Sequence, residues 1–97
     1  MIARVTTLRV KADKLDEVKK YYDDGIVPIV NQKKGFQGGY LFTDRNTGNC
    51  IAIGFWDTEE EAIADEKNTQ FQDRISTITK FVVAKPVWQI YEVASKY

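Results

Sequence analysis

Histidine is absent from this chain of 97 residues, and cysteine occurs only once, as Cys50. Histidine is the most common general base and a frequent metal ligand. Its absence excludes a nucleophile paired with histidine, and a single thiol makes a transition-metal site unexpected. One cysteine also cannot form an internal disulfide. Because Cys50 lies within an apolar segment, we expect it to be a small buried side chain.

The chain also lacks an excess of charge and a long apolar segment. Fourteen basic and fourteen acidic residues give a formal net charge of zero, so nothing indicates nucleic-acid binding. No apolar run approaches the ~20 residues of a membrane helix, and the N-terminus lacks the pattern of a signal peptide. With 43% hydrophobic and 29% charged residues, the composition is typical of a soluble globular protein. We therefore expect one domain over residues 1–97, located in the cytoplasm and not bound to membranes.

The first third of the chain predicts a strand followed by a helix. Residues 2–10 are rich in β-branched side chains and predict the strand. Asp13 is the predicted N-cap of the helix. The apolar face of this helix consists of Leu15, Val18, Tyr22, Ile26 and Ile29. Because proline lacks a backbone N–H, we expect a kink or break between Asp24 and Pro28, and Gly35 is the predicted end of the helix.

The middle of the chain predicts a hairpin. Residues 36–43 and 50–56 predict two strands, and the residues between them, 44–49, are typical of a turn. Gly38 and Gly39 lie within the first of these strands, which indicates a bulge or a close approach of two backbones.

The last part predicts a divided helical region and a final strand. Thr58 and Glu61 have the spacing of a capping box, so a helix is expected to begin there. A second start signal at Thr69 predicts a helical region over residues 58–79 in two pieces, hinged near Asn68. A final strand is predicted over residues 81–93, where a proline, Pro86, indicates an edge position or a bulge.

The order of these elements, βαββαβ, is that of the ferredoxin-like α+β plan with a four-stranded antiparallel sheet. Right-handed crossovers place both helical segments on one face of that sheet. Strand 50–56, with the sequence CIAIGFW, is nevertheless apolar on both sides. A second copy packed sheet to sheet would cover the other face, so we expect a homodimer. The alternative is that the small residues of this strand leave that face exposed to water.

Two long stretches resemble a known family. The stretch VPIVNQKKGFQGGYLF, followed by IAIGFWDTEEEAIADEKNTQFQD, resembles the antibiotic-biosynthesis-monooxygenase-type (ABM) domain of the dimeric α+β barrel superfamily. The positions that match the family pattern are Pro28, Gly35, Trp56, Glu59 to Glu61 and Phe71. The resemblance covers nearly the whole chain and implies a homodimeric barrel with a ligand pocket in each subunit, between the sheet and the helices.

The same family includes cofactor-independent oxygenases of quinol-like or polyketide aromatics, haem-degrading enzymes and isomerases. In the haem-degrading branch a Trp and a His on the second helix would align with Asp65 and Ile75, and an Asn with Thr6 or Thr7. All three are missing here, so haem degradation by that mechanism is not expected. The resemblance instead implies a cofactor-independent monooxygenase-like enzyme, with no cofactor, acting on a small aromatic or quinol-like molecule.

Glu66 is the predicted catalytic base. It follows Ala62 by four residues and Ile63 by three, which places it on the helix face expected to meet the sheet. A carboxylate turned toward an apolar pocket is suited to proton abstraction. The alternative is that the helix ends near Asn68 and Glu66 turns to solvent.

Four other residues are predicted to bind a small aromatic ligand. Trp56 and Tyr22 are expected to form flat walls, and the Tyr22 hydroxyl to bind a ligand oxygen. Arg4 and Thr6 share one face of the first strand, where Arg4 is suited to an anionic group. Core packing or a surface ion pair is the alternative for each of them. A non-catalytic small-ligand-binding or structural dimer therefore stays open as the alternative function.

Overall fold

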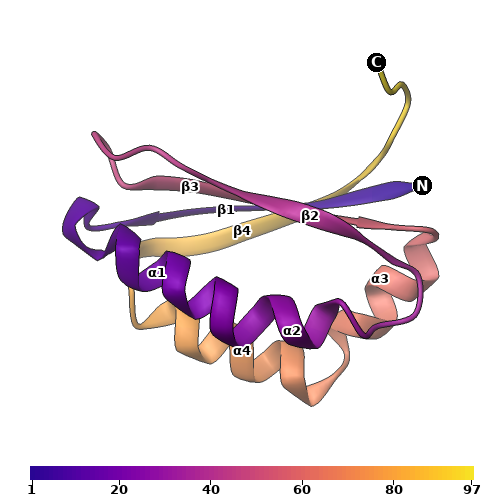
Figure 1. Ribbon diagram of the computed structural model, residues 1–97, viewed down its shortest axis with the longest axis horizontal. Coiled ribbons are helices and arrows are strands. Elements are labelled where there is room, and N and C mark those ends of the chain that lie inside the picture. The colour runs from indigo at the N-terminus through magenta and orange to yellow at the C-terminus, as the bar shows by residue number, and fades with distance from the viewer.

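The computed structural model describes all residues, 1–97, and has two layers, a sheet and a set of helices that covers one of its faces (Figure 1). The strands are β1 (Ile2–Val10), β2 (Phe36–Thr43), β3 (Asn49–Trp56) and β4 (Val82–Glu92). The helices are α1 (Leu15–Tyr21), α2 (Val27–Val30), α3 (Glu59–Glu66) and α4 (Thr69–Thr79). The strands are antiparallel and lie in the order β2-β3-β1-β4, which confirms the predicted ferredoxin-like plan.

The first helical region is broken where the proline predicted a break. A π-helical turn, Tyr22–Ile26, joins α1 to α2, and Pro28 lies in the first turn of α2, where its missing N–H costs no hydrogen bond. The predicted helix end at Gly35 was too late: α2 ends at Val30 with Asn31 as its C-cap, and Gly35, with a φ of 83°, lies in the turn that leads into β2. The predicted N-cap was wrong: a 3₁₀ turn over Ala12–Lys14 precedes α1, and no side chain caps it, because the N–H of Lys14 bonds instead to the Lys11 carbonyl.

The hairpin has the predicted bounds to within one residue. The pairing of β2 with β3 is irregular between Phe36 and Gly39, and Gly38 has a φ of 93°. A Cβ atom at Gly39 would lie 2.2 Å from the carbonyl oxygen of Ile53. Both readings of the glycine pair, a bulge and a close backbone approach, are therefore confirmed.

The second helical region is hinged as predicted, and its first cap is the predicted one. The Thr58 hydroxyl accepts a hydrogen bond from the Glu61 N–H at 3.2 Å. The second cap is Asn68 rather than Thr69: its Oδ1 atom accepts from the Gln70 N–H at 2.8 Å, because the hinge residue itself carries a suitable side chain. No helix is long and apolar enough to cross a membrane.

The final strand, β4, is an edge strand, which explains how it accommodates Pro86. Its pairing with β1 also shifts register after Thr7, so both predicted explanations for the proline apply.

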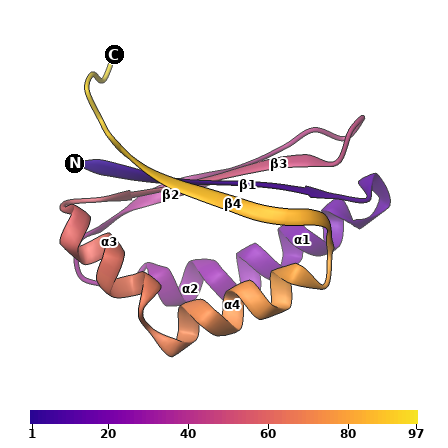
Figure 2. The ribbon, with the colours of Figure 1, turned by 180° about the vertical axis from the view of Figure 1, so that it is seen from behind.

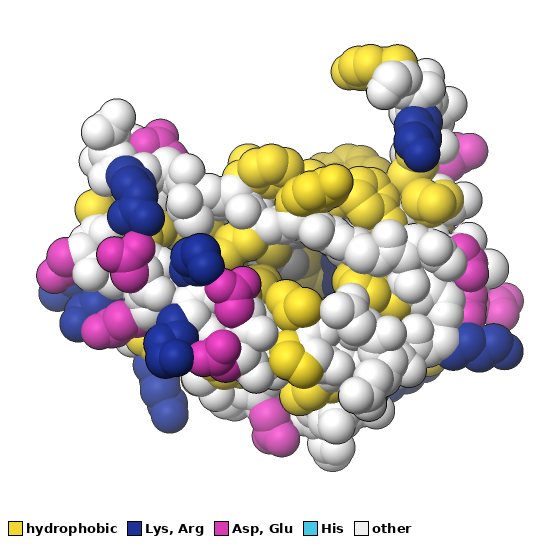
Figure 3. Space-filling view, in the orientation of Figure 1, with side chains coloured by type: hydrophobic (Ala, Val, Ile, Leu, Met, Phe, Trp, Pro, Cys, Tyr) yellow, Lys and Arg dark blue, Asp and Glu magenta, His cyan; other side chains and the backbone are white.

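The two faces of the sheet have very different surroundings. The core between sheet and helices consists of Leu8, Val10, Leu15, Val18, Cys50 and Ile78, and Cys50 is buried as predicted. The opposite face is bare, in the sense that no helix covers it, as the ribbon seen from behind also shows (Figure 2). Its exposed hydrophobic side chains are Tyr40, Phe42, Ile51, Val87 and Tyr91. Figure 3 shows hydrophobic side chains gathered above the sheet on that side.

Candidate functional site

A cavity of about 670 Å³ lies between the inner face of the sheet and the helices. Figure 3 shows it as a hollow with hydrophobic side chains at its rim and a basic side chain in its depth. This volume is within the range of about 300–1,000 Å³ that is usual for small-molecule sites. Fourteen of its 26 lining residues are hydrophobic, as expected for a site that holds an apolar ligand.

Small residues on the sheet leave room for this cavity. Ala52 and Gly54 lie on the inner face of β3, where they pair with Thr6 and Arg4 of β1. Gly39 of the neighbouring strand pairs with Gly54 and also lines the cavity. Larger side chains at these positions would fill the space between the layers. The small residues of CIAIGFW therefore face the cavity and keep it open.

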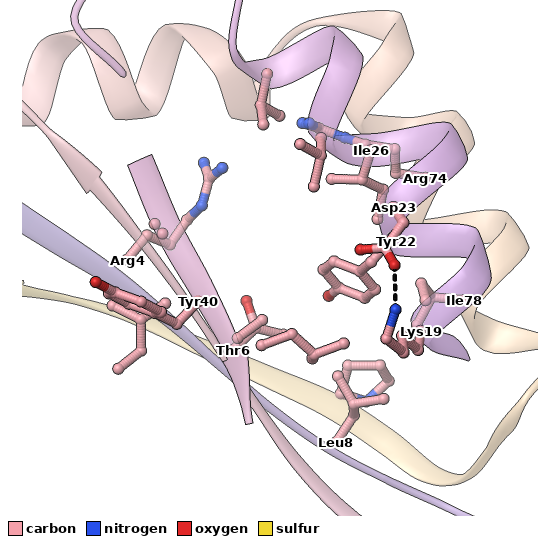
Figure 4. Close-up of a pocket in the computed structure, with 18 of the residues that line it drawn as sticks. Arg4, Thr6, Leu8, Lys19, Tyr22, Asp23, Ile26, Tyr40, Arg74 and Ile78 are labelled. Atoms are coloured by element: carbon pink, nitrogen blue, oxygen red, sulfur yellow. Dashed lines mark hydrogen bonds and ion pairs between the residues drawn. The ribbon is translucent and has the colours of Figure 1, made fainter. Parts of the chain in front are cut away.

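The opposite wall is formed by the broken first helix. The π-helical turn adds a residue to one turn, so that Tyr22, Asp23 and Ile26 line the cavity and α2 continues the same wall. Figure 4 shows these side chains facing the strand residues, with Asp23 paired to Lys19. Single π-helical turns within helices occur frequently at functional sites.

A buried cluster of charges borders one end of the cavity. The Asp65 Oδ2 atom accepts hydrogen bonds from Arg4 Nη2 at 2.7 Å and from Arg74 Nη2 at 2.8 Å. Arg4 Nη1 also donates to the Ala62 carbonyl at 3.1 Å and lies 3.6 Å from Glu66 Oε1. Arg4, Asp65 and Arg74 are buried, and both arginines line the cavity whereas the two carboxylates do not.

Aromatic rings support the two arginines of this cluster. The guanidinium carbons of Arg4 and Arg74 lie 4.9 and 5.1 Å from the centroid of the Phe71 ring, which is within the range of cation–π attraction. Arg4 also lies 5.5 Å from the Trp56 centroid. These contacts are compatible with the hydrogen bonds that the two guanidinium groups donate to Asp65 and to the Ala62 carbonyl.

Tyr22 places a hydroxyl group in the cavity. Its ring reaches from the helix toward the sheet, and its hydroxyl is directed to the side where Thr6 lies (Figure 4). Burial raises the pKa of Tyr22 to about 12, and the nearby Cys50 thiol adds to the increase. The hydroxyl therefore stays protonated at neutral pH and can donate a hydrogen bond to a ligand.

The raised pKa of Tyr22 predicts a pH dependence at the alkaline end. An ultraviolet titration of folded protein is expected to show a tyrosinate step near pH 12 that the Tyr22→Phe variant lacks. Ionisation is disfavoured in the folded state only, so this residue lowers the free energy of unfolding as the pH rises from about 10 to about 12, and has no such effect below. Tyr21→Phe, at the next position, is the control and should keep the step. An unchanged titration of Tyr22→Phe would show that the hydroxyl is solvated.

Three of the five predicted site residues line the cavity: Arg4, Thr6 and Tyr22. Trp56 is 1% exposed and packs edge-on against Phe36, with ring centroids 5.1 Å apart, so it lies behind the cavity wall. Glu66 is half-buried on α3, beside Arg4 and outside the cavity lining. The functional roles of all five remain predictions.

Sequence reasoning missed Arg74 and the buried ion pairs that Asp65 forms with it and with Arg4. The signal for Arg74 is visible in retrospect: it stands between Phe71 and Ile78 at spacings of three and four, so an arginine occupies the apolar stripe of α4. A long charged side chain in such a stripe requires a buried partner. Asp65 is that partner, but it belongs to another helix, and no local pattern links the two.

Comparison with known proteins gives the fold but little about the function. No protein-family model matches the chain. Two curated proteins of Mycobacterium tuberculosis, the uncharacterized proteins Rv2557 and MT2634, are each 30% identical over 89 residues, or 91% of this chain. The chain spans only 40% of the length of these relatives.

Several solved structures have the same fold. A monooxygenase from the ActVA-Orf6 gene of Streptomyces coelicolor, in complex with the ligand nanaomycin D, is similar with a TM-score of 0.87 and 9% identity, over 99% of this chain and 89% of that one. A putative antibiotic biosynthesis monooxygenase from Deinococcus radiodurans has a TM-score of 0.83 and 15% identity, over 100% of this chain and 96% of that one. The predicted resemblance is thus confirmed at the level of the fold: the chain has the same fold as these ABM-type proteins.

Proposed function

We propose that the protein is a cofactor-independent, monooxygenase-like enzyme that binds a small aromatic or quinol-like molecule in the cavity between its layers. The observation that carries this proposal is the cavity itself: mostly apolar walls, a volume of about 670 Å³, and two arginines and a tyrosine hydroxyl that converge on it. The similar fold of a monooxygenase that holds nanaomycin D supports it.

The chemistry needs a substrate that becomes electron-rich when it loses a proton. In a CH₂ group conjugated through aromatic rings to a ketone, a base removes one proton and the resulting carbanion reduces O₂ and forms a C–O bond to it. The O–O bond then breaks and the second hydrogen leaves in water, so CH₂ and O₂ become C=O and H₂O. The contribution of the protein is to hold the substrate, exclude bulk water and stabilise the enolate oxygen.

The residues of the cavity suit these tasks. Arg4 and Arg74 place positive charge beside the position of an enolate oxygen, and the protonated hydroxyl of Tyr22 can donate a further hydrogen bond. Glu66 remains the proposed base, and it would have to turn away from Arg4 to reach a bound substrate. Thr6, on the same strand face as Arg4, supplies a hydroxyl that can orient the ligand.

Anthrone, a tricyclic ketone with one acidic CH₂ group, tests this proposal. We expect the protein to accelerate oxygen uptake and the appearance of anthraquinone, measured by absorbance, above the rate in buffer alone. The Glu66→Gln variant is expected to lose at least about 100-fold of the accelerated rate, because general base catalysis typically contributes that much.

The matched control for this variant is Glu60→Gln, which makes the same change on the exposed side of α3 and should keep the wild-type rate. Asp23→Asn examines the only carboxylate that lines the cavity. If wild-type protein binds anthrone yet leaves its oxidation at the buffer rate, the oxygenase proposal is wrong.

A non-catalytic binding protein is the second candidate, and one observation favours it. The carboxylates nearest the cavity are already engaged by cations: Asp65 by two arginines, Glu66 by Arg4, and Asp23 by Lys19. On this proposal the cavity stores or carries an aromatic molecule without changing it, and the anthrone experiment distinguishes the two candidates.

We propose further that two copies pack sheet to sheet as a homodimer. The bare face of the sheet carries Tyr40, Phe42 and Tyr91, each at least half exposed, and the rings of Tyr40 and Phe42 stack with centroids 5.9 Å apart. Such a contiguous apolar surface on a small protein is usually covered by a partner. A two-fold axis through this face would bury the same residues on both copies.

A further inference from the structure

Arg74 is a buried arginine with most of its hydrogen-bonding capacity unused. Its side chain is only 7% exposed, and of the five N–H donors of a guanidinium group it uses one, from Nη2 to Asp65. It lines the cavity, and its remaining donor atoms are not among the side-chain atoms that are fully buried without a partner, so they are accessible from the cavity. Water in the cavity can accept from these donors, and a ligand with a charged acceptor would replace it with a stronger hydrogen bond.

Arg4 strengthens the same end of the cavity. It shares the Asp65 Oδ2 atom with Arg74, so the two guanidinium groups approach each other there. Figure 4 shows Arg4 on the sheet side and Arg74 on the helix side of the cavity. The carboxylates of Asp65 and Glu66 balance the charges of the two arginines but lie outside the cavity lining, so the surface that a ligand meets is cationic.

We propose that the ligand of this cavity is an aromatic acid, and that its carboxylate binds the free donors of Arg74 while its rings occupy the apolar part. This inference rests on the proposed ligand-binding role of the cavity but not on its oxygenase chemistry. A planar guanidinium fork matches the two oxygens of a carboxylate. The Tyr22 hydroxyl, which stays protonated, is a further donor on the helix side.

The charge balance favours a singly charged acid over a phosphate ester. Arg4, Arg74, Asp65 and Glu66 together have a formal charge of zero, so a dianion would leave the buried cluster with two uncompensated charges. A carboxylate leaves only one. The other basic residues of the cavity wall, Lys19 and Arg45, are already paired with Asp23 and Asp16 and do not offset it. The apolar lining meanwhile selects rings over sugars or other polar groups.

The first test uses the wild-type protein with a pair of probes that differ only in charge. Isothermal titration at neutral pH should show 2-naphthoate binding at least about tenfold more tightly than 2-naphthamide, because a hydrogen bond to a charged group is worth that much or more. Equal or weaker binding of the acid, or no binding of either probe, would overturn the inference.

The second test assigns the preference to Arg74. In Arg74→Met, which keeps the length and removes the charge, the ratio of amide to acid dissociation constants should fall to about one, and Arg74→Lys should restore part of it. Arg45→Met is the matched control: it removes a positive charge from the cavity mouth, where Arg45 is exposed and pairs with Asp16, and should keep most of the ratio.

A merely structural role for Arg74 would weaken both probes together and leave the ratio unchanged, which would also overturn the assignment. The measurement is a ratio within one protein sample, so reduced stability of the variant does not imitate the expected result. A preference for the acid without anthrone oxidation removes only the oxygenase proposal. Anthrone oxidation without that preference removes only this inference.

Discussion

Replacing Ile51 by aspartate is expected to convert the protein from a dimer into a monomer. Ile51 lies on the bare face of β3, between Thr7 of β1 and Phe42 of β2, and is 40% exposed in the single chain. An aspartate there meets water in the monomer, so the fold should tolerate it. In a dimer packed through this face, two carboxylates would be buried without partners, one on each copy, at a cost of several kcal/mol.

Light scattering after size-exclusion chromatography measures the outcome directly. Wild-type protein is expected at twice the chain mass of 11.1 kDa, and Ile51→Asp at the mass of one chain, with its dissociation constant raised about 1,000-fold or more. Val27→Asp is the matched control, because Val27 is also 40% exposed but lies on the helical layer. A dimeric Ile51→Asp, or a monomeric wild type at micromolar concentration, would contradict the sheet-to-sheet arrangement.

The fold could be predicted because its signals are local. The alternation of the strands, the spacing of three and four in the helices, and the helix-interrupting residues Pro28 and Asn68 each indicate one element without knowledge of its neighbours. The two wrong caps, Asp13 and Thr69, show the limit of such signals. Either residue type can cap a helix, but which one does so depends on the path by which the chain enters.

The inward face of the first strand was also accessible to prediction, because alternate residues of a strand point to the same face. Once β1 is a strand, Arg4, Thr6 and Leu8 must share a face, and the small residues of β3 must lie opposite them. This is why Arg4 and Thr6 could be assigned to the cavity from sequence.

The charged cluster could not be predicted in the same way, because it joins three elements. The short helix α3 has its buried positions at Ala62 and Asp65, whereas Glu66 is only half-buried. Adjacent helical residues point in directions that differ by about 100°. A small error in the predicted orientation of the helix therefore makes Glu66 the buried carboxylate in place of Asp65. The pairing of Asp65 with Arg4 and Arg74 is determined by how the helices pack on the sheet. The spacing of residues within one element does not indicate that packing.

Removing the Asp65 carboxylate is expected to lower the stability of the fold strongly. Its side chain is 1% exposed and its Oδ2 atom holds both Arg4 and Arg74. In Asp65→Ala these two buried guanidinium groups lose their shared partner, and breaking a buried ion pair typically costs about 3–5 kcal/mol. That is a large part of the ~5–15 kcal/mol by which a domain of this size is usually stable.

Urea unfolding followed by circular dichroism measures this change, and Asp73→Ala, which removes an exposed carboxylate from α4, is the control. The control should unfold within about 0.5 kcal/mol of wild type. The stability lost in Asp65→Ala comes from buried arginine charges that no longer have a partner. Removing one of these charges should therefore recover part of the lost stability. Asp65→Leu combined with Arg74→Met should be more stable than Asp65→Leu alone. If the double variant is no more stable than Asp65→Leu, the cost of losing Asp65 is a packing defect, and its carboxylate does not hold the two arginines at the cavity.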